Sequence, residues 1–250
     1  MPEGFAGSAH FKTLTSLRFL AAFWVVLFHF STILPAGSLK ELGFISNGIM
    51  AVDFFFILSG FILSHIYRDK FSSGKITKSS FYIKRIARIY PVHLFVLCLY
   101  IAMILLAQKS GAFENFSTQM RIYYEGLSPR TIASNLFLVH GWGTESTLLL
   151  NKPSWSISAE WFAYLCFPFL IVAGRKMPRL TWLVAGLFLA AVLWWGAPLL
   201  GIKKFTQLTF DYSMLRIMPE FLLGMGVYEL SSKYKLTVKA WPLFHVFLFL

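Results

Sequence analysis

The sequence is poor in charged residues. Only 14% of its 250 residues are Asp, Glu, Lys or Arg, whereas 57% are hydrophobic. A soluble domain carries about 25% charged residues, so this composition excludes an ordinary water-soluble domain. The apolar residues also gather in runs close to the roughly 20 residues that a membrane-spanning helix needs. We therefore predict an all-α, polytopic helical membrane protein.

Acidic residues are scarcer than basic ones, with 11 against 23 and a formal net charge of +12. The basic residues lie in short segments between apolar runs, which is the pattern of the positive-inside rule. We therefore expect the lipid bilayer as a partner, and no nucleic acid. A site for a polyanionic cosubstrate is the alternative use of this charge. The densest basic segment, 67–88, is predicted to face the cytoplasm, which places the N-terminus there as well.

The sequence has only two cysteines and lacks several common catalytic motifs. Cys98 and Cys166 both lie within apolar runs and form no disulfide framework. There is no Gly-rich phosphate loop, no HExxH and no repeat of fixed period. Apart from His29, the histidines show no metal-ligand spacing: His10, His65, His93, His140 and His245. We interpret them as structural or interfacial, except that His140 in "HGW" is also a candidate for function. We therefore expect no metal.

Six apolar segments are predicted to cross the membrane. They are residues 16–34, 45–66, 89–107, 156–173, 180–200 and 212–230. The segment "TIASNLFLVHGW" at 131–142 is too short and too polar for a span, and the basic loops that follow favour a re-entrant or peripheral position. The apolar run at 241–250 is predicted to begin a seventh span. We therefore expect residues 1–250 to be the N-terminal portion of a single membrane domain that continues beyond Leu250.

Ionisable residues within the apolar runs indicate function, because charge is costly in lipid. Arg18 and His29 are eleven residues apart, which returns them to almost the same helix face, about 16 Å apart along the axis. The structural alternatives are snorkelling of Arg18 to lipid phosphates and an interhelical hydrogen bond from His29. Asp53, followed by three phenylalanines, must face protein or water, or be protonated.

Three further motifs carry charge. Arg85 and Arg88 in "RIARIYP" share a helix face, and a guanidinium suits phosphate, although a positive-inside anchor is the commoner use of such a pair. Glu160 ends "WSISAE", where an acidic residue can also simply favour a helix N-terminus. Arg216 and Glu220 in "RIMPEFLLG" are four apart, which favours an ion pair.

Together these motifs resemble acyltransferase family 3, the bacterial membrane O-acyltransferases. The matching segments, in order from about Leu14 to Gly226, are Arg18 with His29, "AVDFFFILSGF", "RIARIYP", "WSISAE" and "RIMPEFLLG". Lys84 stands where the family frequently has the first of two arginines. The resemblance implies transfer of an acyl group, often acetyl, from acyl-CoA to a hydroxyl of a sugar or another surface molecule at the bacterial inner membrane. It also implies that Arg18 and His29 are essential and that the Arg85/Arg88 region serves the CoA donor.

The candidate residues follow from these motifs. The catalytic candidates are His29, as general base or acyl carrier, Arg18, Asp53 and Glu160, of which Asp53 or Glu160 would orient the imidazole. The candidates for binding acyl-CoA are Arg85, Arg88 and Arg18, and those for the acceptor substrate are Trp155, Ser156, Arg216 and Glu220. The competing function is a proton-coupled transporter of a small molecule or lipid-linked sugar, because intramembrane Asp, Glu and His also form proton relays.

Overall fold

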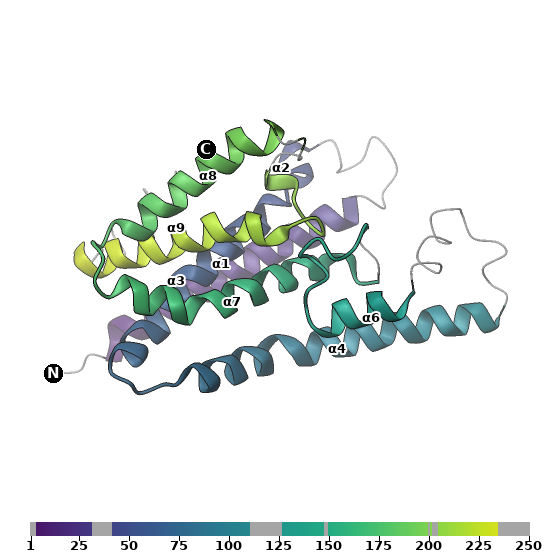
Figure 1. Cartoon of the computed structure of the whole chain (residues 1–250), viewed down its shortest axis with the longest axis horizontal. Helices are drawn as coiled ribbons and strands as arrows, with labels where there is room; N and C mark the ends of the chain where they lie inside the picture. The colour runs from purple at the N-terminus through teal and green to yellow at the C-terminus, as the bar shows by residue number, and fades with distance from the viewer. Residues whose placement is uncertain are drawn as a thin grey trace. The chain divides into compact units, whose positions relative to one another are not determined.

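The computed structural model describes residues 4–31, 42–110, 127–147, 150–199, 201 and 205–234. Side chains are described in the same ranges, except for residues 4–15, 205, 233 and 234. Within these ranges every regular element is a helix, as the sequence predicted (Figure 1).

The described elements are helices and short 3-10 turns. In chain order they are α1 (Gly4–Ser31), α2 (Gly43–Ser46), α3 (Met50–Ser72), α4 (Lys78–Lys109), α6 (Pro129–Leu136), the 3-10 turn η3 (Lys152–Ser154), α7 (Trp155–Gly174), α8 (Thr181–Leu199), the 3-10 turn η4 (Phe205–Gln207) and α9 (Ser213–Tyr234). The apolar run at 241–250, the predicted seventh span, lies outside the described residues.

A long helix occupies each of the six predicted spans. Four of them are long and apolar enough to cross a bilayer: α3, α4, α7 with its preceding turn, and α8. The part of α1 whose side chains are described, Ser16–Ser31, is apolar but shorter than these four. Helix α9 is not among the four. The helices are those of a multi-pass membrane protein, and the exact number of crossings stays a prediction.

Two helix boundaries differ from the predicted ones. The predicted second span at 45–66 divides into the short α2 and the long α3, because a turn at 47–49 separates them. Helix α4 extends eleven residues before the predicted third span, to Lys78, and Thr77 caps it by accepting a 3.2 Å hydrogen bond from the backbone N–H of Ser80. The arginines of "RIARIYP" therefore lie inside α4.

The segment at 131–142 contains a short helix followed by turns. Helix α6 begins at Pro129, with Ser128 as its N-cap accepting from the N–H of Thr131 at 3.1 Å. Its eight residues are about 12 Å long, which cannot cross a hydrocarbon core of about 30 Å. This agrees with the prediction that the segment does not cross.

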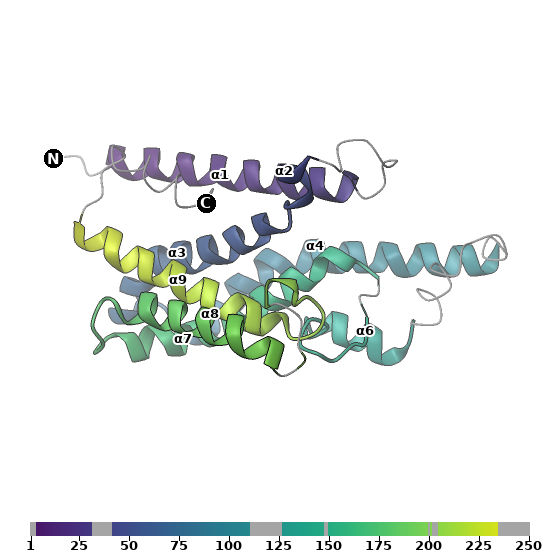
Figure 2. The ribbon, with the colours of Figure 1, turned by 90° about the horizontal axis from the view of Figure 1, so that it is seen from above.

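The chain forms two compact units. Unit 1 consists of residues 1–65, 178–185 and 220–250, and unit 2 consists of residues 66–177 and 186–219. In unit 1, α2 lies beside α1 (Figure 2), where the rings of Trp24 and Phe44 stack at 4.6 Å and the Trp24 indole N–H donates to the Phe44 carbonyl at 2.7 Å.

Two glycines let α3 and α9 approach closely in unit 1. A Cβ on Gly60 would lie 2.1 Å from the Phe221 carbonyl oxygen, and a Cβ on Gly224 would lie 1.9 Å from the carbonyl oxygen of Ile57. Glycine at an interface is a common way for membrane helices to bring their backbones together.

Aromatic side chains form the core of unit 2 where the end of α3 meets α4 and α7. Phe81 is fully buried, and its ring lies 5.3 Å from that of Phe167 and 5.6 Å from that of Phe71. The Tyr82 hydroxyl donates to the Leu165 carbonyl at 3.1 Å, which joins α4 to α7.

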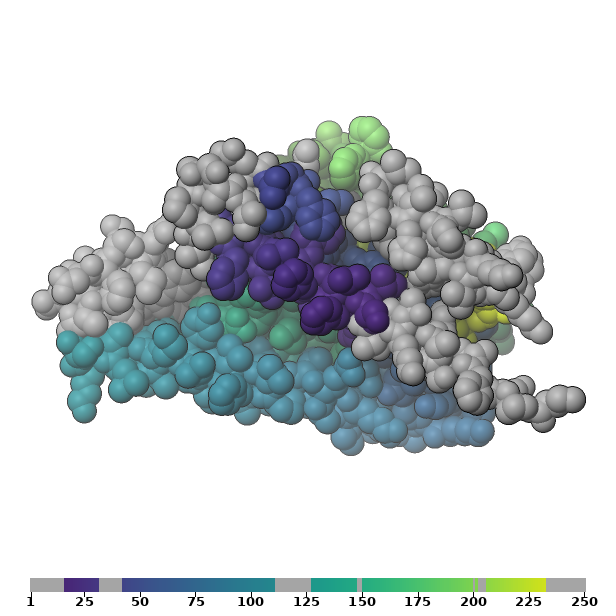
Figure 3. Space-filling view, turned by 180° about the vertical axis from the view of Figure 1, so that it is seen from behind, coloured from purple at the N-terminus to yellow at the C-terminus, as the bar shows by residue number. Residues whose placement is uncertain are grey.

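Much of α4 is exposed and apolar. The space-filling view shows α4 as a long continuous surface (Figure 3). Its exposed apolar side chains include Ile83, Val92, Phe95, Met103 and Leu106. A surface of this kind is suited to contact with lipid tails.

We expect Gly60→Ala and Gly224→Ala to destabilise the protein, because neither methyl group fits between the two backbones. The cost should be about 1–3 kcal/mol or more, the usual range for overpacking. Thermal unfolding in detergent micelles measures it. The matched control is Gly196→Ala in α8, where an added Cβ meets no atom within 4 Å. An equal loss in all three variants would contradict the close approach of α3 and α9.

Candidate active site

Arg18 and His29 both lie on α1, as predicted. Arg18 is half-buried and His29 is exposed. The His29 ring makes a 2.8 Å hydrogen bond from Nδ1 to the carbonyl oxygen of Val25, one turn earlier on the helix. A carbonyl can only accept, so Nδ1 carries the proton. Nε2 is therefore the nitrogen that holds the basic lone pair when the ring is neutral.

Asp53 and Glu220 are the other predicted site residues of unit 1. Asp53 lies in the first turn of α3 and is half-buried. Glu220 lies on α9 and is buried. The remaining predicted residues belong to unit 2, so each unit contains part of the predicted set.

Arg85 and Glu160 belong to one connected network in unit 2. The Arg85 Nη2 donates to the Tyr67 hydroxyl at 2.8 Å, and the guanidinium also faces the ring of Tyr164 at 5.6 Å. The Tyr164 hydroxyl in turn donates to Oε1 of Glu160 at 2.5 Å. Arg88, one turn further along α4 than Arg85, is exposed. The structure therefore separates the two arginines that the sequence treated as a pair.

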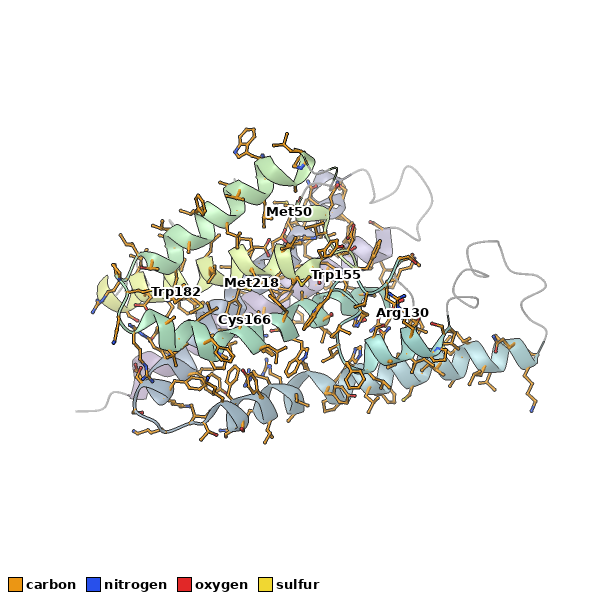
Figure 4. The ribbon with its side chains drawn as sticks, in the orientation of Figure 1. Met50, Arg130, Trp155, Cys166, Trp182 and Met218 are labelled. Carbon is orange, nitrogen blue, oxygen red and sulfur yellow. The ribbon has the colours of Figure 1, made fainter. Side chains whose placement is uncertain are left out.

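Trp155 and Arg216, two predicted substrate residues, are also in contact. Trp155 lies at the start of α7 (Figure 4), and the Arg216 guanidinium lies 5.1 Å from the centre of its ring. Arg216 is completely buried, so a cation–π contact with tryptophan stabilises its charge more than it would at an exposed site. Ser156 instead makes a local contact, donating to the Pro153 carbonyl at 2.9 Å.

A buried histidine pair lies elsewhere in unit 2. The rings of His93 and His140 stack nearly parallel, with centroids 5.8 Å apart. The His93 Nε2 donates to the Asn135 backbone carbonyl at 2.9 Å. Ser154 Oγ gives its only proton to the Asn151 carbonyl, so it must accept from Nε2 of His140, 3.0 Å away. Both rings thus carry the proton on Nε2, and neither buried Nδ1 makes a hydrogen bond to a described residue.

The loop that carries His140 is held by two serines. The Ser158 hydroxyl on α7 accepts from the Gly141 N–H at 3.0 Å and donates to the Leu138 carbonyl at 2.7 Å. The Ser213 hydroxyl at the start of α9 donates to the Gly141 carbonyl at 2.7 Å. Gly141 has no room for a side chain, because a Cβ would lie 2.6 Å from Ser213 Oγ.

Sequence reasoning missed Tyr67, Tyr164 and Asn135, and it interpreted His93 as structural or interfacial without naming a partner. A signal existed for Tyr164 alone, because it follows Glu160 by four residues and such pairs meet on a helix. Tyr67 meets Arg85 and Asn135 meets His93 across the fold, 18 and 42 residues away in the chain. Within the described ranges, no three His, Cys, Asp or Glu side chains are grouped as metal ligands.

Comparisons with known proteins find relatives at the level of sequence. The chain is 35% identical over 189 residues to acyltransferase MdmB of Streptomyces mycarofaciens, which covers 72% of this chain and 44% of that protein. It is 30% identical over 118 residues to protein 2 in the picA locus of Rhizobium radiobacter, with 46% and 62% covered. It is 24% identical over 169 residues to O-acetyltransferase OatA of Staphylococcus aureus strain NCTC 8325 / PS 47, with 66% and 26% covered. No solved structure matches.

The helices define a multi-pass membrane protein, and several of its ionisable side chains, among them Arg216, Glu220 and His93, are buried. Residues 11–250 match the acyltransferase domain family, which is nearly the whole chain. The chain therefore belongs to acyltransferase family 3, as the five motifs indicated. It spans less than half the length of MdmB and about a quarter of the length of OatA.

We expect stability to fall as the pH is lowered from about 6.5 to about 4. Burial, and then the neighbouring His93, lower the pKa of His140 from 6.5 to about 4. In this range the unfolded chain binds a proton at His140 and the folded protein does not, so protonation favours unfolding. The loss attributable to this residue should be at most about 3–4 kcal/mol, from about 2.5 pKa units (6.5 − 4) at 1.36 kcal/mol each.

Melting temperatures in micelles between pH 7.5 and pH 4.5 test this expectation. His140→Gln should flatten the pH dependence, because glutamine does not titrate. The exposed His65 provides the matched control, since His65→Gln should leave the pH dependence as it is. An unchanged pH dependence in His140→Gln would show that His140 is not the titrating group.

Proposed function

We propose that the protein is a membrane O-acyltransferase that moves an acyl group from acyl-CoA to a hydroxyl acceptor, a sugar or surface polysaccharide precursor. Two relatives support this proposal by their names, an acyltransferase and an O-acetyltransferase. The second name also favours acetyl as the group transferred. The protein would act in the bacterial inner membrane, with its N-terminus in the cytoplasm, where CoA is found.

The hydrogen bond from His29 to Val25 is the observation that carries the proposal. A general base must present a lone pair, and the ring nitrogen that keeps it must be fixed. Because Nδ1 donates to a carbonyl of its own helix, Nε2 is basic in the neutral ring. His29 is also exposed on α1, so a reacting group can reach it.

Two routes are compatible with a basic Nε2. As general base, Nε2 takes the proton of the acceptor hydroxyl while its oxygen attacks the thioester carbonyl, and the CoA thiolate leaves. As acyl carrier, Nε2 itself attacks the thioester to give an acyl-imidazole and CoA, and the hydroxyl then takes the acyl group from the ring. In either route a carboxylate, Asp53 or Glu160, would stabilise the imidazolium.

The other predicted residues take the substrate roles in this proposal. The basic segment with Arg85 and Arg88, together with Arg18, supplies positive charge for the CoA phosphates. For the acceptor, the candidates are Trp155, Ser156, Arg216 and Glu220. Because Arg216 and Trp155 are buried and in contact, we propose that this pair shapes the acceptor site and that Arg216 does not act as a surface charge.

We expect His29→Ala to lower acyl transfer by at least about 10²-fold, the lower end of what a general base contributes. The measurement is transfer of label from radiolabelled acetyl-CoA to a hydroxyl acceptor in membranes that contain the protein. His65→Ala serves as the control, because it removes an exposed histidine from α3 instead.

Wild-type rates in His29→Ala would contradict the proposed mechanism. Label that stays on the protein when the acceptor is left out, and is lost in His29→Ala, would select the acyl-carrier route. A protein that moves an intact substrate across vesicles without transferring label would be a transporter.

A further inference from the structure

Arg85 directs its guanidinium toward the protein interior. The group lies against three buried rings, at 5.2 Å from Tyr67, 5.8 Å from Phe81 and 5.6 Å from Tyr164. Arginine stacks well on aromatic faces because its charge is delocalised over a plane. The aromatic rings therefore determine both the position and the tilt of the guanidinium.

Two nitrogen atoms of Arg85, Nε and Nη2, are poorly placed for phosphate. A phosphate that binds side-on needs Nε together with Nη2. Nη2 already donates to the Tyr67 hydroxyl at 2.8 Å, and Nε is buried and makes no hydrogen bond to a described residue. A ligand that approaches from solvent cannot use this edge of the guanidinium.

The same network reaches a carboxylate. Tyr164, whose ring faces Arg85, donates to Glu160 at 2.5 Å, a length typical of a strong hydrogen bond to a charged oxygen. Tyr164 is almost completely buried, so its ring has little freedom once Arg85 packs against it. Arg85 thus packs against the residue that donates a hydrogen bond to Glu160.

Arg88 differs in each of these respects. It lies one turn further along α4 and is exposed. An exposed arginine keeps both bidentate edges available for a phosphate.

We propose that Arg85 is a positioning residue that holds Glu160 through Tyr164, and that Arg88 is the residue that contacts the phosphates of the acyl-CoA donor. This assignment rests on the proposed acyl transfer and divides between two residues a role that the family resemblance gives to both.

Two acyl donors separate these roles. S-Acetylpantetheine carries the same thioester arm as acetyl-CoA and has no phosphate. We expect Arg88→Gln to raise the KM for acetyl-CoA by about tenfold, as for loss of one charge-assisted contact, and not to raise the KM for S-acetylpantetheine. Arg85→Lys and Tyr164→Phe should instead lower kcat by about tenfold or more with both donors, because lysine does not reproduce the planar contact and phenylalanine has no hydroxyl.

Tyr82→Phe is the matched control for Tyr164→Phe. It removes one hydroxyl that joins α4 to α7 through the Leu165 carbonyl and leaves Glu160 untouched, so kcat should stay near the wild-type value. Equal losses of kcat in Tyr82→Phe and Tyr164→Phe would overturn the positioning role. A higher KM for acetyl-CoA alone in Arg85→Lys would overturn it as well, by making Arg85 a phosphate ligand.

A measurement of stability is independent of the reaction. Arg85→Lys should lower the melting temperature in micelles by several degrees and Arg88→Gln by about one degree or less. In a chain of this size, a melting temperature lower by about 2–4 °C corresponds to a small loss of stability. Equal melting temperatures for the two variants would show that Arg85 is not held by the interior. If the wild-type protein transferred acetyl from neither donor, the proposed function would fail while this comparison still decided how Arg85 is held.

Discussion

Polar side chains on membrane helices have no water to satisfy them, so they must find partners within the protein. In unit 2 these partners are largely backbone carbonyls and aromatic rings. The Tyr82 hydroxyl bonds to a carbonyl of α7, and the His93 imidazole bonds to a carbonyl of α6. Each bond satisfies one polar group and also connects two helices. The polar residues thus help to determine which helices pack together, whereas the long apolar runs mainly determine where membrane helices form.

Unit 1 contains a different kind of contact. There α3 and α9 approach through Gly60 and Gly224, each of which lies against a carbonyl of the other helix. Around this crossing, Leu58, Phe61 and Tyr228 form a small apolar cluster. Contact between backbones depends on shape alone, so a single methyl group can disturb it, whereas the hydrogen-bonded contacts of unit 2 depend on particular polar atoms.

The helices could be predicted because their signal is local. A run of about 20 apolar residues is visible in the sequence without any knowledge of what it packs against, which is why α3, α4, α7 and α8 appear where expected. The predicted span did not include the start of α4, because its first turns are rich in Lys and Arg and a hydropathy profile does not assign such residues to a membrane span. A capping threonine, Thr77, was the local signal that places the true start.

Within the candidate site, prediction succeeded for residue types and failed for partners. Arg85 and Glu160 stood out because charge is rare in apolar sequence. Arg85 is connected to Glu160 through Tyr164 and is also hydrogen-bonded to Tyr67. Tyrosine is common in membrane helices, so the sequence did not single out either of these two residues. The contact between His93 and His140 could not be predicted either, because their rings stack although the residues are 47 positions apart in the chain (140 − 93).

The three histidines with described hydrogen bonds show how the backbone assigns a chemical role. A carbonyl or a committed serine hydroxyl can only accept, so its position decides which ring nitrogen carries the proton. In His93 and His140 this leaves the lone pair on a buried Nδ1, where no substrate can reach it. In His29 the bond to Val25 leaves the lone pair on Nε2 of an exposed ring. Of the three, His29 alone combines a lone pair at the tip of the ring with an exposed position, and this combination is what the proposed acyl transfer would require.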